Sequence, residues 1–407
     1  MFLSCIGCGA RYSLDQIIYE CKRCGDLLEV RMEEGDVEGT SLLEKWKERP
    51  VNVWKYKELL PISSYESIVS LNEGGTTLHR CKRLGPELGL NNLYVKNEGE
   101  NPTGSFKDRG MTVGVTKAIE LGAKIVACAS TGNTSASLAA YSAKAGLGCL
   151  VIIPSGKIAM GKLAQAMLHG AKVVAINGNF DTAFAMILEA SIKYGVYLLN
   201  SINPFRLEGQ KTAAFEVCEQ LGWNPPDVVV MPVGNAGNIS AYWKGFQEFL
   251  TLGIVNTSPK MIGIQAEGAQ PIAKAVMLGR KEIEPVYDPE TVASAIRIGR
   301  PVSWKKALKA IYDSQGTART STDKEILDAQ KLLARKEGLF VEPASASSIA
   351  GLQKLVKEGI VERDQVIVCV TTGNGLKDPE TAIQNSEKVI EIPSEIGEVL
   401  KILELMQ

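Results

Sequence analysis

From about Leu93 onward, the chain alternates between short apolar runs and longer helical segments. The apolar runs are rich in β-branched residues and are apolar nearly throughout: LYVK, KIVACA, CLVIIP, KVVAIN, VYLLN, DVVVMPV, MIGIQAE and QVIVCVTT. Such runs are typical of strands that are buried on both faces of a parallel sheet. Helical segments separate most of them, for example TSASLAAYSAKAG, DTAFAMILEASIKYG, QKTAAFEVCEQLG and DKEILDAQKLLARKEG. The alternation therefore predicts an α/β protein built on open, mainly parallel sheets.

The composition narrows the possible partners and compartments. The 407 residues leave room for two domains and a small appendage. A net charge of −1 gives no reason to expect nucleic acid or an anionic membrane as a partner. No apolar run reaches the ~18–20 residues of a membrane span, and the start of the chain lacks a signal-peptide pattern, so we expect a cytoplasmic protein. The two histidines, His79 and His169, lie far apart, which disfavours a Ser-His-Asp or Cys-His catalytic arrangement.

Four of the nine cysteines fall in the first 24 residues, as two Cys-x-x-Cys-Gly pairs. Thiolates at this spacing can bind one metal ion, and the glycine permits the tight turn that follows. We therefore predict a structural zinc ribbon over residues 1–34, with Cys5, Cys8, Cys21 and Cys24 as ligands. Two disulfides or a decayed site are the alternatives, and a reducing compartment disfavours the disulfides. The stretch LLEKWKERPVNVWKYKELLP after the ribbon predicts a short helix and then an extended segment.

Lys107 stands at the start of an expected helix, beside Phe106 and directly after a Pro-Thr-Gly-Ser turn. The helix dipole favours an acid at such a position and destabilises a cation. A solvated first-turn lysine is the ordinary explanation. The alternative is a lysine that the dipole and burial keep partly neutral, for use as a nucleophile or base.

Loops rich in small polar residues follow several of the predicted strands, where open α/β sheets bind their ligands. Residues Gly234–Asn238 open a helix and predict a phosphate cup, with a plain capped turn as the alternative. Residues Ser130–Ser137 can bind a carboxylate, although helix capping uses the same residue types. Arg206 precedes a further helix start and offers a second anion site. A lysine and a phosphate cup together fit pyridoxal phosphate, and the other two loops fit a substrate with a carboxylate and a phosphate.

Four motifs, in their order along the chain, resemble those of the fold-type II pyridoxal phosphate enzymes: NPTGSFKDRG, STGNTSAS, GNAGN and TTGNGLKDP. The likeness extends from about Leu71 to about Pro379. It is greatest to those members that convert O-phosphohomoserine and water to threonine and phosphate, through a cofactor aldimine, γ-elimination and β-addition of water. The resemblance implies a large cofactor-binding domain of residues 35–99 and 196–407, a small mobile domain of residues 100–195, and a homodimer.

The same resemblance assigns roles to individual residues. Lys107 would carry the cofactor and act as the base, Phe106 would pack near the cofactor, and Asn133 would bind its 3'-hydroxyl. Thr372, preferred to Thr371, would face the pyridine nitrogen. The cofactor phosphate would be held by Gly234, Asn235, Ala236, Gly237 and Asn238. The substrate carboxylate would contact Ser130, Thr131 and Thr134, and the substrate phosphate would contact Asn200, Ser201 and Arg206.

Three other functions compete with this assignment. A serine/threonine dehydratase needs no substrate phosphate site, so Arg206 disfavours it, whereas a phosphoserine-using cysteate synthase does need one. A non-catalytic ligand sensor with a nucleic-acid-binding ribbon is disfavoured by Lys107 and the phosphate cup. Since no candidate site residue lies in the ribbon, we expect catalysis to survive removal of residues 1–34.

Overall fold

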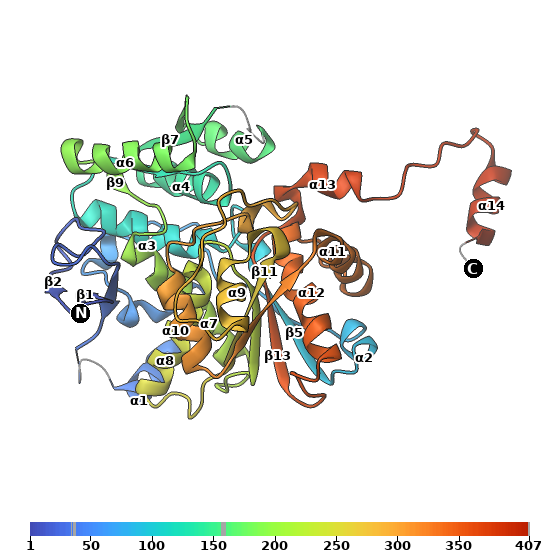
Figure 1. Ribbon diagram of the computed structural model, residues 1–407, viewed down its shortest axis with the longest axis horizontal. Coiled ribbons are helices and arrows are strands. Elements are labelled where there is room, and N and C mark those ends of the chain that lie inside the picture. Colours follow the sequence, from blue (N-terminus) through green and yellow to red (C-terminus); the bar gives the residue numbers. More distant parts are fainter. Residues whose placement is uncertain (34, 36–37, 156–159, 406–407) are drawn as a thin grey trace.

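The computed structural model describes the whole chain except residues 34, 36–37, 156–159 and 406–407. Two sheets form the body of the molecule, one above the other in the view of Figure 1, and the N-terminal segment lies at their left-hand side. The prediction of an α/β protein with open, mainly parallel sheets is confirmed.

The larger sheet has six strands in the order β12-β11-β10-β13-β5-β4. Their bounds are β4 Leu78–Arg80, β5 Asn92–Asn97, β10 Val228–Pro232, β11 Lys260–Ala266, β12 Thr317–Ser321 and β13 Val366–Thr371. All neighbours pair in parallel except β4, which runs antiparallel to β5 at one edge. Strand β12 was not predicted, because its sequence TARTS is polar and its place at the other edge leaves it only partly buried.

Helices cover both faces of this sheet, and alternate residues of β10 show how. Val229 and Met231 point into a core shared with helices α7 to α10, whereas Val228 and Val230 point into a second core shared with α11 and α12. The helices on this sheet are α2 Leu84–Glu87, α7 Pro204–Gln220, α8 Gly237–Thr251, α9 Pro271–Met277, α10 Trp304–Asp313, α11 Asp323–Glu337 and α12 Pro343–Lys357.

The smaller sheet has four parallel strands in the order β8-β7-β6-β9. Its strands are β6 Ile125–Ala129, β7 Gly148–Pro154, β8 Lys172–Ile176 and β9 Tyr197–Leu198, and its helices are α3 Lys107–Glu120, α4 Asn133–Ala145, α5 Met160–Leu168 and α6 Phe180–Tyr194. Strand β9 pairs with β6 although the predicted boundary at residue 195 places it in the larger unit. The division into a cofactor domain and a mobile domain stays a prediction.

The N-terminal segment forms a three-stranded antiparallel sheet of β1 Phe2–Cys5, β2 Arg11–Tyr12 and β3 Leu28–Arg31. Helix α1 Gly39–Trp46 follows, as expected. The expectation of an extended segment after it is wrong, because Val53–Leu59 forms the 3₁₀ helix η1. Its side chains Val53, Trp54 and Tyr56 are buried, and the Asn52 side chain caps its first turn.

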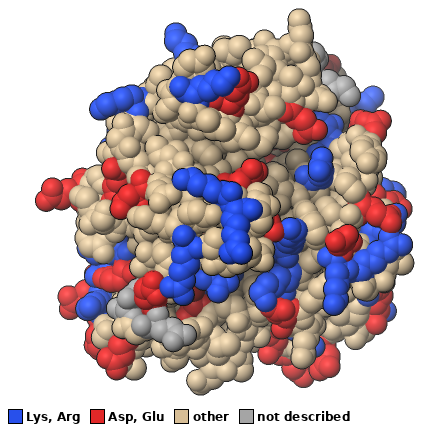
Figure 2. Space-filling model, turned by 60° about the vertical axis from the view of Figure 1, so that its left-hand side comes forward, with Lys and Arg blue, Asp and Glu red and all other residues tan. Residues whose placement is uncertain are grey.

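Helix α13 Pro379–Gln384 leads into an extended segment that leaves the body and carries helix α14 Ile396–Leu405 (Figure 1). On the face shown in Figure 2, basic side chains gather over the middle and acidic ones surround them. Among the described residues, no helix is both long and apolar enough to cross a membrane.

Candidate active site

The loop before α3 and the loop after β13 lie against each other. Strands β5 and β13 are parallel neighbours, so the loops at their carboxyl ends meet at one edge of the sheet. The Phe106 amide donates to the Thr372 carbonyl at 3.0 Å, and the Asn374 amide donates to the Gly104 carbonyl at 2.9 Å. Lys107, the first residue of α3, is thereby placed beside Thr372.

Lys107 is half-buried, and its Nζ lies 4.1 Å from the centre of the Phe106 ring. Burial, reinforced by the Arg206 guanidinium, lowers the pKa of Lys107 to about 7, although Glu342 opposes the shift. A lysine with this pKa is present in both protonation states near neutral pH, as a nucleophile or base requires.

A buried carboxylate, Glu342, lies among the residues predicted to bind a ring. The Asn133 side-chain N–H group donates to both Glu342 oxygens, at 3.1 and 3.2 Å. The Thr372 hydroxyl is 3.4 Å from Glu342 Oε1 and 3.0 Å from the Ser345 hydroxyl. Thr371 instead directs its hydroxyl to the Lys96 carbonyl on β5, so Thr372 is the threonine that faces the site.

The loop 234–238 has the backbone shape of an anion cradle. Ala236 adopts a left-handed conformation with φ of 66°, and α8 begins at Gly237. A Cβ added to Gly237 would have only Gln210 Oε1 within 4 Å, so there is room in front of the helix start. Both polar atoms of the buried Asn238 side chain lack a hydrogen-bond partner among the described residues.

The Asn235 side chain connects this cradle to a second candidate anion site, the substrate-phosphate pole, which consists of Ser201 and Arg206. Its Nδ2 donates to the Ser201 hydroxyl at 2.7 Å, and its Oδ1 accepts from the Val302 amide at 2.7 Å. At that pole, the buried Arg206 donates through Nη1 to the Leu199 carbonyl at 3.1 Å, and its Nε has no partner within the described structure. Burial lowers the pKa of Arg206 to about 10. A buried guanidinium without a carboxylate partner is suited to bind an anion.

Asn200 holds the ends of two strands together. Its Oδ1 accepts from the Ala129 amide at 2.9 Å and its Nδ2 donates to the Ala129 carbonyl at 3.0 Å. Both ends of the side chain are therefore used, and the loop from Ser130 to Thr134 is fixed next to Ser201. Ser130, Thr131 and Thr134 are half-buried at the start of α4, whose first residue is Asn133.

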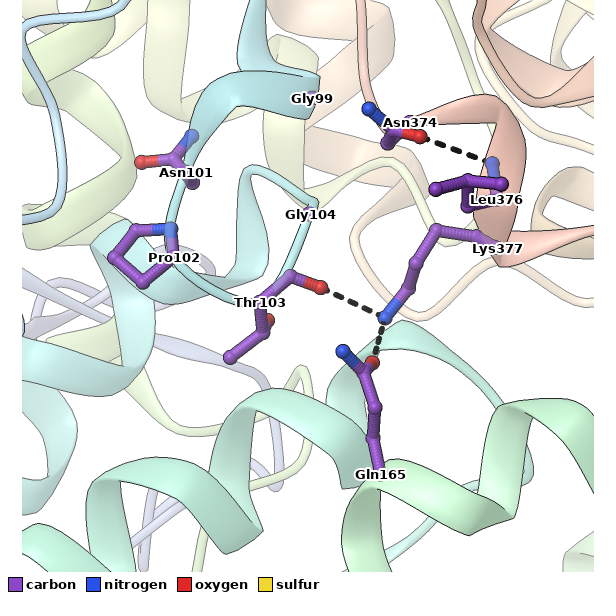
Figure 3. Close-up of a pocket in the computed structure, with 9 residues that line it drawn as sticks. All are labelled: Gly99, Asn101, Pro102, Thr103, Gly104, Gln165, Asn374, Leu376 and Lys377. Carbon is purple, nitrogen blue, oxygen red and sulfur yellow. Dashed lines mark hydrogen bonds between the residues drawn. The ribbon is translucent and has the colours of Figure 1, made fainter.

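A cavity of about 400 Å³ lies between the loop before α3, the loop after β13 and Gln165 on α5 (Figure 3). It is lined by Gly99, Asn101, Pro102, Thr103, Gly104, Gln165, Asn374, Leu376 and Lys377. The Lys377 ammonium reaches across it and donates to the Thr103 carbonyl at 2.9 Å and to Gln165 on α5 (Figure 3). The cavity therefore opens beside the lysine loop, between elements of the two sheets.

In the N-terminal segment, the four predicted metal ligands come together. The sulfur atoms of Cys5, Cys8, Cys21 and Cys24 all lie within 4.8 Å of one another. Cys5 and Cys24 are 3.4 Å apart, and Cys8 and Cys21 are 3.6 Å apart. These separations suit four thiolates around one ion, and all nine cysteines of the chain are free rather than disulfide-bonded.

Comparisons with known proteins show the family of the chain. The family described as pyridoxal-phosphate dependent enzyme matches residues 69–373. A threonine synthase of Methanocaldococcus jannaschii is 60% identical over 403 residues, which are 99% of each chain. A threonine synthase of Methanosarcina acetivorans is 56% identical, and one of Mycobacterium tuberculosis is 52% identical over 83% of this chain and 91% of its own. The chain therefore belongs to the pyridoxal-phosphate-dependent enzyme family and, within it, to the branch of the threonine synthases.

Solved structures support the fold. A maize serine racemase superposes with a TM-score of 0.64 at 20% identity, over 81% of this chain and 93% of its own. A processed threonine deaminase from Solanum lycopersicum gives 0.65 at 21% identity, over 89% and 96%. At this identity the likeness shows the fold alone, which is that of the fold-type II enzymes.

Glu342 and Ser345 are the site residues that were not predicted from the sequence. A signal for Glu342 was present, because it follows the apolar run Leu339–Val341 and precedes Pro343 at a helix start. A single acidic residue at a helix start is so common as a cap that its type alone indicates no chemistry.

Proposed function

We propose that this chain is a threonine synthase that converts O-phospho-L-homoserine and water into L-threonine and phosphate. The observation that carries the proposal is a pair of anion-binding places together with one lysine of lowered pKa. One place is the cradle at 234–238, the other is Arg206, whose charge acts on Lys107, and the bond between Asn235 and Ser201 connects the two loops. A phosphorylated cofactor and a phosphorylated substrate need two such places.

The described residues fit pyridoxal phosphate. Asn133 Oδ1 is buried without a partner in the described part of the chain, as are both ends of the Asn238 amide, so polar groups are free to bind a ring hydroxyl and a phosphate. We assign the cofactor to Lys107, Phe106, Asn133, Thr372 and the loop Gly234–Asn238. When bound, the cofactor supplies an electron sink that makes protons on the substrate carbon chain removable.

Lys107 is the residue that we assign to proton transfer. With a pKa of about 7, its amine accepts a proton at neutral pH and returns it later. Thr372 presents a hydroxyl rather than a carboxylate, so it can hydrogen-bond the ring nitrogen without holding it protonated. Glu342 fixes the orientation of Asn133 and lies close enough to influence the charge of Lys107.

The substrate is held at its two anionic ends. We assign its carboxylate to Ser130, Thr131 and Thr134 at the start of α4, where the helix dipole favours an anion. We assign its phosphate to Ser201 and Arg206, with Asn200 at the same pole acting through its two bonds to Ala129. Among the described residues no carboxylate pairs with Arg206, so its guanidinium is available to stabilise the phosphate group as it leaves the substrate.

We further propose that the four N-terminal cysteines bind one structural zinc ion, and that the enzyme works in the cytoplasm as a homodimer. The sulfur geometry and the free thiols support the zinc assignment. Elemental analysis of the purified protein should give one zinc per chain. A fully reduced, folded protein without metal would contradict this assignment.

Product analysis tests the function. The purified protein with pyridoxal phosphate should form threonine and phosphate in equal amounts from O-phosphohomoserine, and it should act poorly on O-phosphoserine. Borohydride should attach the cofactor to the peptide that contains Lys107. Turnover of phosphoserine without turnover of phosphohomoserine would overturn the proposal in favour of the cysteate synthase alternative.

A further inference from the structure

Tyr19, which lies between the two cysteine pairs, inserts into the core of the smaller sheet. Its ring is 7% exposed and packs edge-to-face on Tyr197 at 6.1 Å between centres. Its hydroxyl accepts a hydrogen bond from the Leu198 amide at 2.7 Å and another from the Ser191 hydroxyl at 3.3 Å. The apolar residues around it include Ile152 and others from β6, β7 and α6. One residue of the ribbon is therefore part of the smaller sheet's core.

The opposite side of the ribbon is attached to the helices of the larger sheet. Lys244 on α8 donates to the Val30 carbonyl at 2.5 Å, and Lys306 on α10 donates to the Leu28 carbonyl at 2.9 Å. Lys305 forms an ion pair with Asp26 at 2.6 Å. Leu3, Leu28 and Val30 also share a buried cluster with Trp54, Val113 and Phe205. The ribbon thus contacts both sheets, as its place in Figure 1 also indicates.

The hydrogen bond to Tyr19 is made by Leu198, just before the segment that contains Ser201 and Arg206, the substrate-phosphate pole. Leu198 ends β9, and both of its peptide groups are held by side chains, the amide by Tyr19 and the carbonyl by Asn203 at 2.9 Å. The next carbonyl, of Leu199, accepts from Arg206. A shift of Leu198 would therefore displace Ser201 and Arg206 together.

We propose that the ribbon positions the substrate-phosphate pole through Tyr19, so that metal loading of the ribbon sets the affinity for the substrate. Tyr19 is two residues from Cys21, and a metal ion on Cys21 would fix the course of the chain at Tyr19. The inference rests on the proposed role of Arg206 and Ser201. It replaces the expectation that catalysis survives removal of residues 1–34, since removal would expose Trp54, Val113 and Phe205 and leave the Leu198 amide without its acceptor.

Tyr19→Phe in the zinc- and cofactor-loaded enzyme is the direct test, because it removes the hydroxyl and keeps the ring. Hydrogen exchange of the peptide covering residues 197–203 should become faster. KM for phosphohomoserine should rise about three- to tenfold, with kcat and the cofactor absorbance changed by less than about twofold. Removal of zinc by a chelator should speed exchange in the same peptide. Lys305→Gln is the matched control, since it removes a ribbon contact with α10 and should leave both readouts unchanged.

Three results would overturn the inference. The first is an unchanged exchange rate in Tyr19→Phe, and the second is faster exchange with an unchanged KM. The third is an equal effect of Lys305→Gln, because general loosening of the ribbon would then explain both readouts. Failure of the proposed function would give a different result. Arg206→Lys would then leave KM for phosphohomoserine unchanged, while hydrogen exchange in Tyr19→Phe would still show whether Tyr19 holds residues 197–203 in place.

Discussion

Two buried arginines on adjoining helices, Arg109 on α3 and Arg206 on α7, have opposite surroundings. Arg109 donates to Glu98 and Glu216 through all three of its nitrogens, with further bonds to Thr76 and Thr212. Burial alone would lower its pKa, but the Glu216 and Glu98 carboxylates outweigh burial and hold the pKa of Arg109 well above its ordinary value. Within the described part of the chain, Arg206 has one backbone carbonyl as its partner, and burial lowers its pKa to about 10.

The contrast distinguishes buried charges that hold the fold together from buried charges that are available to bind ligands. The partners of a buried, fully paired charge cannot be removed without destabilising the fold, whereas an unpaired buried charge itself destabilises the fold unless a ligand pairs with it. Lys107 lies two residues from Arg109 on α3, yet it belongs with Arg206 in this respect, because its pKa of about 7 also reflects a charge without sufficient compensation. Unpaired cations mark the places where the enzyme meets anions and the cofactor aldehyde.

The largest expected effect is on activity and comes from Lys107→Ala. The variant loses the covalent anchor and the base together, so turnover should fall about 10³-fold or more. Its free energy of unfolding should fall little or even rise, since a poorly compensated cation is removed. Steady-state kinetics measure the loss of turnover, and denaturant unfolding measures the change in stability. Loss of stability as large as that of an Arg109 variant would contradict the contrast.

Arg109→Met should show the reverse behaviour. It leaves the Glu98 and Glu216 carboxylates buried without their guanidinium, which costs about 3–5 kcal/mol of stability. Lys96 remains on Glu216, and the pKa of Glu216 should rise from about 2 as its first partner is lost. Denaturant unfolding measures the loss. Arg49→Met is the control, because its pair with Glu58 is partly exposed and should contribute only about 1 kcal/mol or less.

The contrast also shows which parts of the site could be predicted from the sequence. Lys107 and the loop 234–238 could be proposed from the sequence because their candidate chemistry lies in one short stretch beside a predicted strand or helix start. Glu342 was not, because its partner Asn133 is 209 residues away in the chain and the pairing depends on how the two sheets meet. The same limit explains why the bond between Asn235 and Ser201, and the insertion of Tyr19, were missed.

For Arg206→Lys we expect a smaller effect, confined to phosphorylated substrates. Lysine keeps the charge but loses the forked geometry. The transition state should therefore lose about 1.5–3 kcal/mol of stabilisation, so kcat/KM for phosphohomoserine should fall roughly ten- to a hundredfold. The slow side reaction with serine should be nearly unaffected, and unfolding should change by less than about 1 kcal/mol. Equal damage with both substrates would make Arg206 a structural residue like Arg109.

The smallest effect concerns pH, and it tests the link between Lys107 and Glu342. Capture of added pyridoxal phosphate by the cofactor-free protein requires the neutral amine, so its rate should rise with pH through about 7, rather than through the ordinary lysine pKa of 10.5. Glu342→Gln removes the negative charge that favours the protonated lysine. The pKa of Lys107 should then fall, and the rise in rate should move to lower pH. Stopped-flow absorbance across pH 5–9, a range of about two pH units on either side of that pKa, measures both profiles. An unchanged profile would contradict this link and would leave Glu342 acting only through its hydrogen bonds to Asn133.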